Sequence, residues 1–140
     1  MYTILQTAHS LWASFTVILL SIVVVYSLLR LNAKRFFTAR DRKIALLALI
    51  FSHVQLILGL ILYFLSPLGF ARLGQMSDST LRLTSLEHPL VGIIAITLIT
   101  IGWIKHKNKE EIAEKFKPIA IFYGIGLLLI LSRIPWSLWF

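Results

Sequence analysis

Apolar residues gather in four long runs that are separated by short polar stretches. The runs cover roughly residues 11–29, 44–66, 89–104 and 118–132. About 20 apolar residues in a helix cross the hydrocarbon core of a bilayer, and each run reaches or approaches that length. The pattern predicts an all-α membrane protein in which residues 1–140 form a single four-helix transmembrane domain.

Proline marks several of the expected helix ends. Pro67 ends the second run, while Pro89 and Pro118 open the third and fourth, in the first helical turn, where a missing N–H costs nothing. The first run has no basic segment before it and no small-residue cleavage site after it, so we expect it to be retained as a span. Short connections between consecutive helices favour an up-down-up-down four-helix transmembrane bundle.

Positive charge is confined mainly to two of the connections. Of the fourteen Lys and Arg residues, six lie between the first and second runs and five between the third and fourth. By the positive-inside rule these two connections are cytoplasmic. Both termini and the connection from Pro67 to Glu87 are then expected on the outer side of the membrane. Topology therefore accounts for the net charge of +8, and we expect the lipid bilayer, not nucleic acid, as the partner.

Composition narrows the chemistry further. Hydrophobic residues make up 58% of the chain and charged residues 14%, against about 45–50% and about 25% in soluble domains. Cysteine is absent. Its absence excludes disulfides, thiolate metal sites, iron–sulfur ligation and covalent attachment of haem.

Two histidines are expected at the same depth in the bundle. His9 lies at the outer end of the first helix and His88 at the outer end of the third, with Arg133 at the outer end of the fourth. Depth follows from the helical rise of about 1.5 Å per residue. The first and third helices of an up-down bundle are diagonal across its core, so His9 and His88 are predicted to bind one metal between them.

Small residues follow each histidine on its own helical face. The first helix continues from His9 through Ala13 and Thr16 to Leu20; the third continues from His88 through Gly92, Ala95 and Ile99. These small residues leave room for a flat macrocycle, which together with the paired histidines predicts a site for haem b. The alternative is that small residues merely let transmembrane helices approach each other.

Arginines at the outer level are candidate partners for the haem propionates. Arg133 is the first of them, since an arginine at the end of a span is costly and normally has a partner. That partner is a propionate or, in the alternative, Glu87. Arg72 and Arg82 in the outer connection are further candidates. We expect each haem ligand to have its second ring nitrogen held by a hydrogen bond, with Gln6 and Glu87 as sources.

The other two histidines are interpreted differently. His53 lies near the bilayer midplane, where an ionisable residue is a functional candidate, but no histidine shares its depth. It is expected to contact Thr100 or Tyr123, either as a neutral buried residue or, with Tyr123, as a quinone or proton site. His106 lies among lysines and is expected to be solvated. His53 and the pair Gln55 and Gly59 point to different faces of one helix, and the sequence leaves open which face is central.

Three stretches resemble a family of small bacterial four-span membrane proteins labelled cytochrome b. They are FSHVQLILGLILYFLSP, LEHPLVGIIAITLITIG and KFKPIAIFYGIGLLLILSRIPW. QLILG followed by a span-opening histidine is also similar to one half of haem A synthase, whose half-bundle holds a haem b between histidines of its first and third helices. That resemblance implies His9 and His88 as ligands. Ser10 stands where that family has an arginine and Gln6 where a carboxylate would be expected, so haem A synthesis is not implied.

Two functions follow from these observations. The first is a b-type cytochrome of the bacterial inner membrane that carries electrons, with one bis-histidine haem near the outer face and a redox partner, a quinone being a further candidate ligand. It is an electron carrier more than an enzyme, because two imidazoles fill both axial positions of the iron. The second is a haem-free structural or accessory subunit of a larger membrane complex. A transporter is disfavoured, because the spans hold a single central histidine and no acidic residue.

Overall fold

A computed structural model describes residues 1–139 of the chain. Within them four helical stretches are long and apolar enough to cross a membrane: Tyr2–Asn32, Ala39–Leu65, Ser79–Lys107 and Ile112–Ser132. No strand occurs in the described residues. The predictions of an all-helical chain and of four candidate membrane spans are confirmed.

Changes in helical pitch divide the stretches Ser79–Lys107 and Ile112–Ser132 into shorter elements, and η1 and α7 are separate short helices. In chain order these elements are α1 (Tyr2–Asn32), α2 (Ala39–Leu65), η1 (Phe70–Arg72), α3 (Ser79–Arg82), η2 (Leu83–Glu87), α4 (His88–Lys107), η3 (Ile112–Lys115), α5 (Phe116–Pro118), η4 (Ile119–Tyr123), α6 (Gly124–Ser132) and α7 (Trp136–Trp139). The long helices extend beyond the predicted apolar runs at most of their ends, because polar and basic residues continue each helix past its apolar segment.

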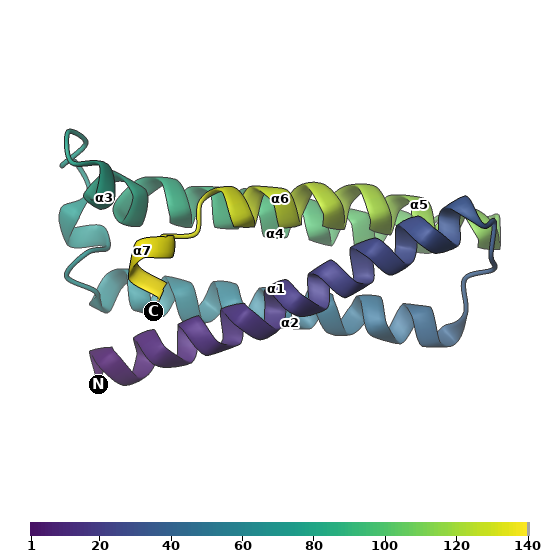
Figure 1. The fold of residues 1–140 in the computed structure, drawn as a ribbon, viewed down its shortest axis with the longest axis horizontal. Helices are drawn as coiled ribbons and strands as arrows, with labels where there is room; N and C mark the ends of the chain where they lie inside the picture. The colour runs from purple at the N-terminus through teal and green to yellow at the C-terminus, as the bar shows by residue number, and fades with distance from the viewer. Residues whose placement is uncertain (140) are drawn as a thin grey trace.

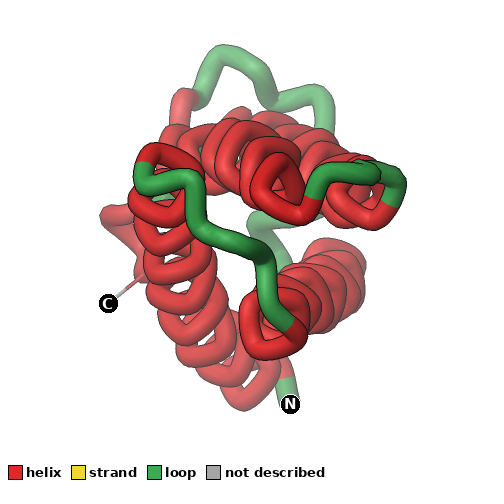
Figure 2. Tube along the Cα trace, turned by 90° about the vertical axis from the view of Figure 1, so that its right-hand side faces the viewer, coloured by secondary structure: helices red, strands yellow, loops and turns green. Residues whose placement is uncertain are grey.

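The long helices lie in two pairs. Figure 1 shows α4 beside the α5–α6 segment on one side and α1 with α2 on the other, and the end-on view in Figure 2 shows the four helices around a common axis. The helix α1 crosses the molecule obliquely, so that its C-terminal part lies by α5 while its N-terminal part diverges from α6 (Figure 1). Both chain ends lie at the end of the molecule that carries α3.

The packed core fills the middle of the molecule. Leu20, Ala48, Ile99 and Tyr123 belong to one cluster and are fully buried. Large apolar side chains on the outer surface remain exposed, as lipid-facing residues of a membrane protein would be, for example Phe15, Ile57 and Leu128. The hydroxyl of Tyr123 donates to the carbonyl of Ala45 at 2.9 Å, which joins η4 to α2 through the core.

The start of α2 is fixed by a capping box. The Thr38 side chain accepts a hydrogen bond from the backbone N–H of Asp41, and the Asp41 carboxylate accepts from the backbone N–H of Thr38. Such reciprocal caps satisfy N–H groups that an α-helix leaves unpaired at its first turn. The Tyr26 hydroxyl also donates to Asp41, at 2.9 Å, so the buried carboxylate ties α1 to α2.

The helix that carries His88 contains a π-helical turn directly before it. This turn is η2, and it joins α3 to α4 without interruption. A π turn holds one residue more than the α-helical count and occurs often at functional sites. The turn is anchored to α2, because the Tyr63 hydroxyl donates to the backbone carbonyl of the buried Ser85 at 2.9 Å. His88 is therefore positioned by a helix whose outer end is fixed on its neighbour.

Candidate functional site

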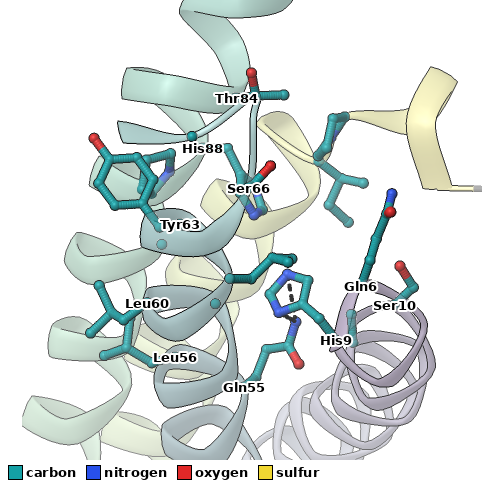
Figure 3. Close-up of a pocket in the computed structure, with 18 of the residues that line it drawn as sticks. Gln6, His9, Ser10, Gln55, Leu56, Leu60, Tyr63, Ser66, Thr84 and His88 are labelled. Carbon is teal, nitrogen blue, oxygen red and sulfur yellow. Dashed lines mark hydrogen bonds between the residues drawn. The ribbon is translucent and has the colours of Figure 1, made fainter. Parts of the chain in front are cut away.

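A cavity of about 200 Å³ lies between the helices at the end of the molecule that carries both termini. Its walls come from α1, α2, α4, the outer end of α6 and α7. The divergence of α1 from α6 leaves this space, and α7 bridges the two, because the Trp139 indole donates to the backbone carbonyl of Ser10 at 3.3 Å. Figure 3 shows His9 and Gln55 pointing into it. His88 also lines it.

The two histidines that the sequence paired by depth lie next to each other. The ring centroids of His9 and His88 are 6.3 Å apart, and the ring planes are nearly perpendicular, at 87°. His9 comes from the second and third turns of α1, and His88 is the first residue of α4. Residues 79 positions apart in the chain are thus brought together in one cavity.

The hydrogen bond of His88 defines its tautomer. Its Nδ1 lies 2.9 Å from the backbone carbonyl oxygen of Arg133. A carbonyl can only accept, so Nδ1 carries the proton and Nε2 keeps its lone pair. A ring nitrogen held in this way is what orients a metal-binding histidine. The sequence proposed Glu87 as the partner; the carboxylate is engaged elsewhere, and a backbone carbonyl at the end of α6 takes this place.

The polar partner of His9 comes from a different helix than expected. Gln55 Nε2, on α2, lies 3.2 Å from both Nδ1 and Nε2 of His9 (Figure 3). Gln6 lines the cavity, but Gln55 is the glutamine that contacts the ring. The signal in the sequence was the pair Gln55 and Gly59, four residues apart on one helical face. Both residues line the cavity, which answers the question of which face of α2 is central here.

Only some of the small residues that follow the two histidines along their helices line the cavity. Ala13, Thr16 and Gly92 belong to its walls, and a Cβ placed on Gly92 would meet nothing within 4 Å. The next residues on the predicted face of α4 point elsewhere: Ile99 and the backbone of Ala95 pack against Gly126 of α6. The small residues near the histidines therefore line the cavity, whereas those farther along the helices allow close helix packing. Both the predicted pocket and the alternative of close helix approach thus apply to this face.

Two of the three arginines predicted to serve propionates, Arg82 and Arg133, pair with Glu87. Arg133 Nε lies 3.4 Å from one carboxylate oxygen of Glu87, and Arg82 Nε lies 2.9 Å from the other. Arg82 also donates to the carbonyl of Met76, and Arg72 donates to the carbonyl of Pro67. The alternative partner that the sequence offered for Arg133 is thus the one it contacts. All three members of the Arg82–Glu87–Arg133 group are partly exposed.

Replacing Arg133 by leucine is expected to have a small effect on the stability of the haem-free protein. The Arg133 side chain is 47% exposed, and Glu87 would keep Arg82 as its partner. Partly exposed ion pairs contribute about 0–1 kcal/mol, well below the cost of breaking a buried pair. Unfolding in detergent measures the change, with Arg72→Leu in the outer connection as control. A loss of several kcal/mol in Arg133→Leu alone would contradict this expectation.

His53 and Tyr123 are not brought together. His53 Nδ1 lies 2.9 Å from the carbonyl of Leu49, and its Nε2 lies 3.3 Å from the hydroxyl of Thr100 on α4. The Tyr123 hydroxyl is engaged by Ala45. Neither residue lines the cavity of His9 and His88. The contact with Thr100 that the sequence named is present, while a quinone or proton role for His53 with Tyr123 stays a prediction.

The expectation of a solvated His106 is wrong. The side chain is 2% exposed and packs against the rings of Trp103 and Phe37, with centroids 4.4 and 5.4 Å away. Its Nδ1 hydrogen-bonds the carbonyl of Trp103. The lysines around His106 in the sequence suggested exposure, but Lys105 and Lys107 point outward while the polar stretch between α1 and α2 covers the imidazole with Phe37.

The donor set of the cavity is limited to two imidazoles. Within residues 1–139 no group of three or more His, Cys, Asp or Glu side chains is placed to hold a metal ion. A bare metal would therefore have only these two imidazoles among the His, Cys, Asp and Glu side chains of the cavity, whereas a metal in a macrocycle needs only two protein ligands. Comparison of the chain with protein-family models, with curated proteins and with solved structures gives no match.

Proposed function

We propose that this protein is a b-type cytochrome that carries electrons in a membrane, with one haem b bound between His9 and His88. The observation that carries the proposal is the separation of the two imidazole rings. The two imidazoles come from different helices and share one cavity, so they could hold one metal between them. The measured separation is 6.3 Å.

The surroundings of the two rings support the same assignment. His88 has its Nδ1 proton directed at the Arg133 carbonyl, which leaves Nε2 as the free ligand atom. Gly92 adds no side chain to the space inward of His88. The walls of the cavity are mainly apolar, with Ile96, Ile130 and Ile134 among them, and such walls keep water away from a bound macrocycle. The residues present therefore fit a haem better than they fit a bare ion.

Haem iron supplies one-electron redox chemistry, and this chain supplies its ligands and surroundings. If both imidazoles held the iron, no ligand position would be left for oxygen, which would favour electron transfer. His9 and His88 hold the group, the Arg133 carbonyl and Gln55 orient the rings, and the isoleucines exclude water. Arg82 and Arg133 both form ion pairs with Glu87. Each arginine could therefore bind a propionate only by contacting it together with Glu87 or by giving up the ion pair with Glu87.

The visible spectrum of purified protein from haem-replete cells tests the proposal. We expect a low-spin b-type spectrum and one haem per chain, because the cavity contains one pair of histidines. Absence of haem from a folded, monodisperse preparation would overturn the proposal and would favour the second function, a haem-free subunit of a larger membrane complex.

The proposal places the haem on the outer side of a bacterial inner membrane, in an up-down-up-down bundle. The cavity lies at the end that carries both termini, and the connections richest in lysine and arginine lie at the other end (Figure 1). The positive-inside rule assigns that basic end to the cytoplasm.

A reporter that is active only in the cytoplasm checks this orientation. Fused after the last residue of the chain it should be silent, and inserted between residues 108 and 114 it should be active, because five basic residues flank or occupy that connection. Matched expression of the two fusions is confirmed by immunoblot. The opposite pattern of activity would reverse the orientation and move the haem to the cytoplasmic side.

A further inference from the structure

The amide of Gln55 faces both ring nitrogens of His9 at once. Its Nε2 lies 3.2 Å from Nδ1 and 3.2 Å from Nε2 of the ring (Figure 3). A neutral imidazole has one nitrogen with a proton and one with a lone pair. The amide N–H group can therefore donate to only one of the two nitrogens, and it cannot accept the proton of the other.

The carbonyl oxygen of the same amide lacks a hydrogen bond. Gln55 Oε1 is buried and has no hydrogen-bond partner among residues 1–139. A buried carbonyl oxygen without a partner costs about 1–3 kcal/mol. The nitrogen and oxygen of an amide have nearly the same shape, so a half-turn of the group exchanges them without moving the chain. After that half-turn Oε1 faces His9 and can accept from the ring nitrogen that carries the proton, while Nε2 takes the buried position that Oε1 occupied.

Gly59 shapes the same contact from one turn farther along α2. A Cβ at Gly59 would lie 3.0 Å from Cε1 of His9, closer than ordinary van der Waals contact. The ring of His9 thus rests on the bare backbone of Gly59 while Gln55 faces its nitrogens. Together these two residues of α2 determine where the imidazole of α1 sits.

We propose that Gln55 is the positioning residue of His9 and that its amide has two settings. With His9 unbound, the amide N–H group donates to the lone pair of the ring. With His9 bound to a metal, that lone pair is used, only a protonated nitrogen remains, and Oε1 accepts from it. This inference rests on the proposed function, since the second setting requires a metal on His9. It gives Oε1 a partner and makes the bound imidazole a stronger ligand.

Two substitutions at position 55 separate this role from simple packing. Gln55→Met keeps the length of the side chain and removes both hydrogen-bonding groups, whereas Gln55→Glu keeps only acceptors. The reduction potential of the bound haem is expected to rise in Gln55→Met and to fall in Gln55→Glu. A tenfold change in the preference for the oxidised over the reduced form corresponds to about 59 mV for one electron, and we expect shifts of that order in opposite directions. Haem retention should fall 10–100-fold in Gln55→Met.

The haem-free protein provides a second readout. In ¹⁵N NMR of histidine-labelled protein in detergent, Gln55→Glu should change the tautomer populations of His9, because a carboxylate accepts only from the protonated nitrogen. Gln75→Leu, an exposed glutamine of the outer connection, is the matched control and should change neither potential nor tautomer.

The outcomes distinguish the inference from the function on which it rests. Potentials that shift in the same direction in both variants, or that do not shift, would overturn the role of Gln55 while leaving a cytochrome in place. Unchanged His9 tautomers in Gln55→Glu would also overturn it. A wild-type protein that binds no haem would overturn the proposed function and, with it, the second setting of the amide.

Discussion

Alanine in place of His9 or of His88 is expected to abolish the low-spin b-type spectrum or to turn it high-spin. Each substitution removes one of the two imidazoles whose centroids lie 6.3 Å apart, and the described residues that line the cavity include no third His, Cys, Asp or Glu to replace it. If a haem is held as proposed, loss of one of its two protein ligands would change the spin state of the iron or release the haem. Absorption spectra and haem-to-protein ratios of the purified variants measure the effect.

The other histidines provide matched controls for this result. His53→Ala and His106→Ala remove side chains that are bonded to Thr100 and Trp103 and do not line the cavity. Both variants should keep the wild-type spectrum, even where their stability falls. If His53→Ala lost the spectrum and His9→Ala kept it, the haem would lie nearer the membrane centre and the pairing of His9 with His88 would be wrong.

The second large effect is expected on stability, from Gly102→Ala. A Cβ at Gly102 would lie 2.6 Å from Cβ of Phe122 and 3.1 Å from the carbonyl oxygen of Pro118. Neither atom is the free end of a flexible side chain, so α4 and the α5–η4 segment must move apart. Overpacking of this kind costs about 1–3 kcal/mol. Unfolding of the protein in detergent, followed by circular dichroism, measures the loss.

Gly124→Ala is the matched control for Gly102→Ala. The nearest atom to a Cβ at Gly124 is a methyl carbon of Val24 at 3.6 Å, which is ordinary contact. Alanine also has the higher helix propensity, by about 1 kcal/mol. Gly124→Ala should therefore leave stability unchanged or raise it. Equal losses in the two variants would show that the glycines act through backbone flexibility and not through close packing of the helices.

Much of the architecture follows from the sequence because the bilayer imposes a simple rule. Long apolar runs and their intervals predicted four spans, and the helices include those runs. The helical rise gave His9 and His88 the same depth, and the two rings lie in one cavity. In both cases the prediction depends on the position of a residue along a helix, which can be read directly from the sequence.

Other features depend on which helix faces which, and the sequence does not report that directly. Gln55 reaches His9 from α2 because α1 crosses it obliquely, an angle that no local pattern encodes. His106 is buried because Phe37, from a connection distant in the chain, covers it. Arg133 pairs with Glu87 across two helices. These contacts arise from tertiary packing, so composition around each residue gave a poor or incomplete expectation.

The orientation of Arg82 and Glu87 relative to His88 depends on the number of residues in the π-helical turn η2 more than on which residues they are. In an α-helix, side chains five residues apart point about 140° away from each other, whereas a π turn aligns them. Arg82 and Glu87 are five residues apart and form an ion pair at 2.9 Å across this turn. Because a π turn holds one residue more than an α turn, deleting one residue from Leu83–Glu87 would let the turn close as α-helix and would keep Arg82 and His88 in nearly the same relative orientation. A further one-residue insertion would instead exceed what the widened turn accommodates and would rotate the preceding loop by about 100° relative to the imidazole of His88.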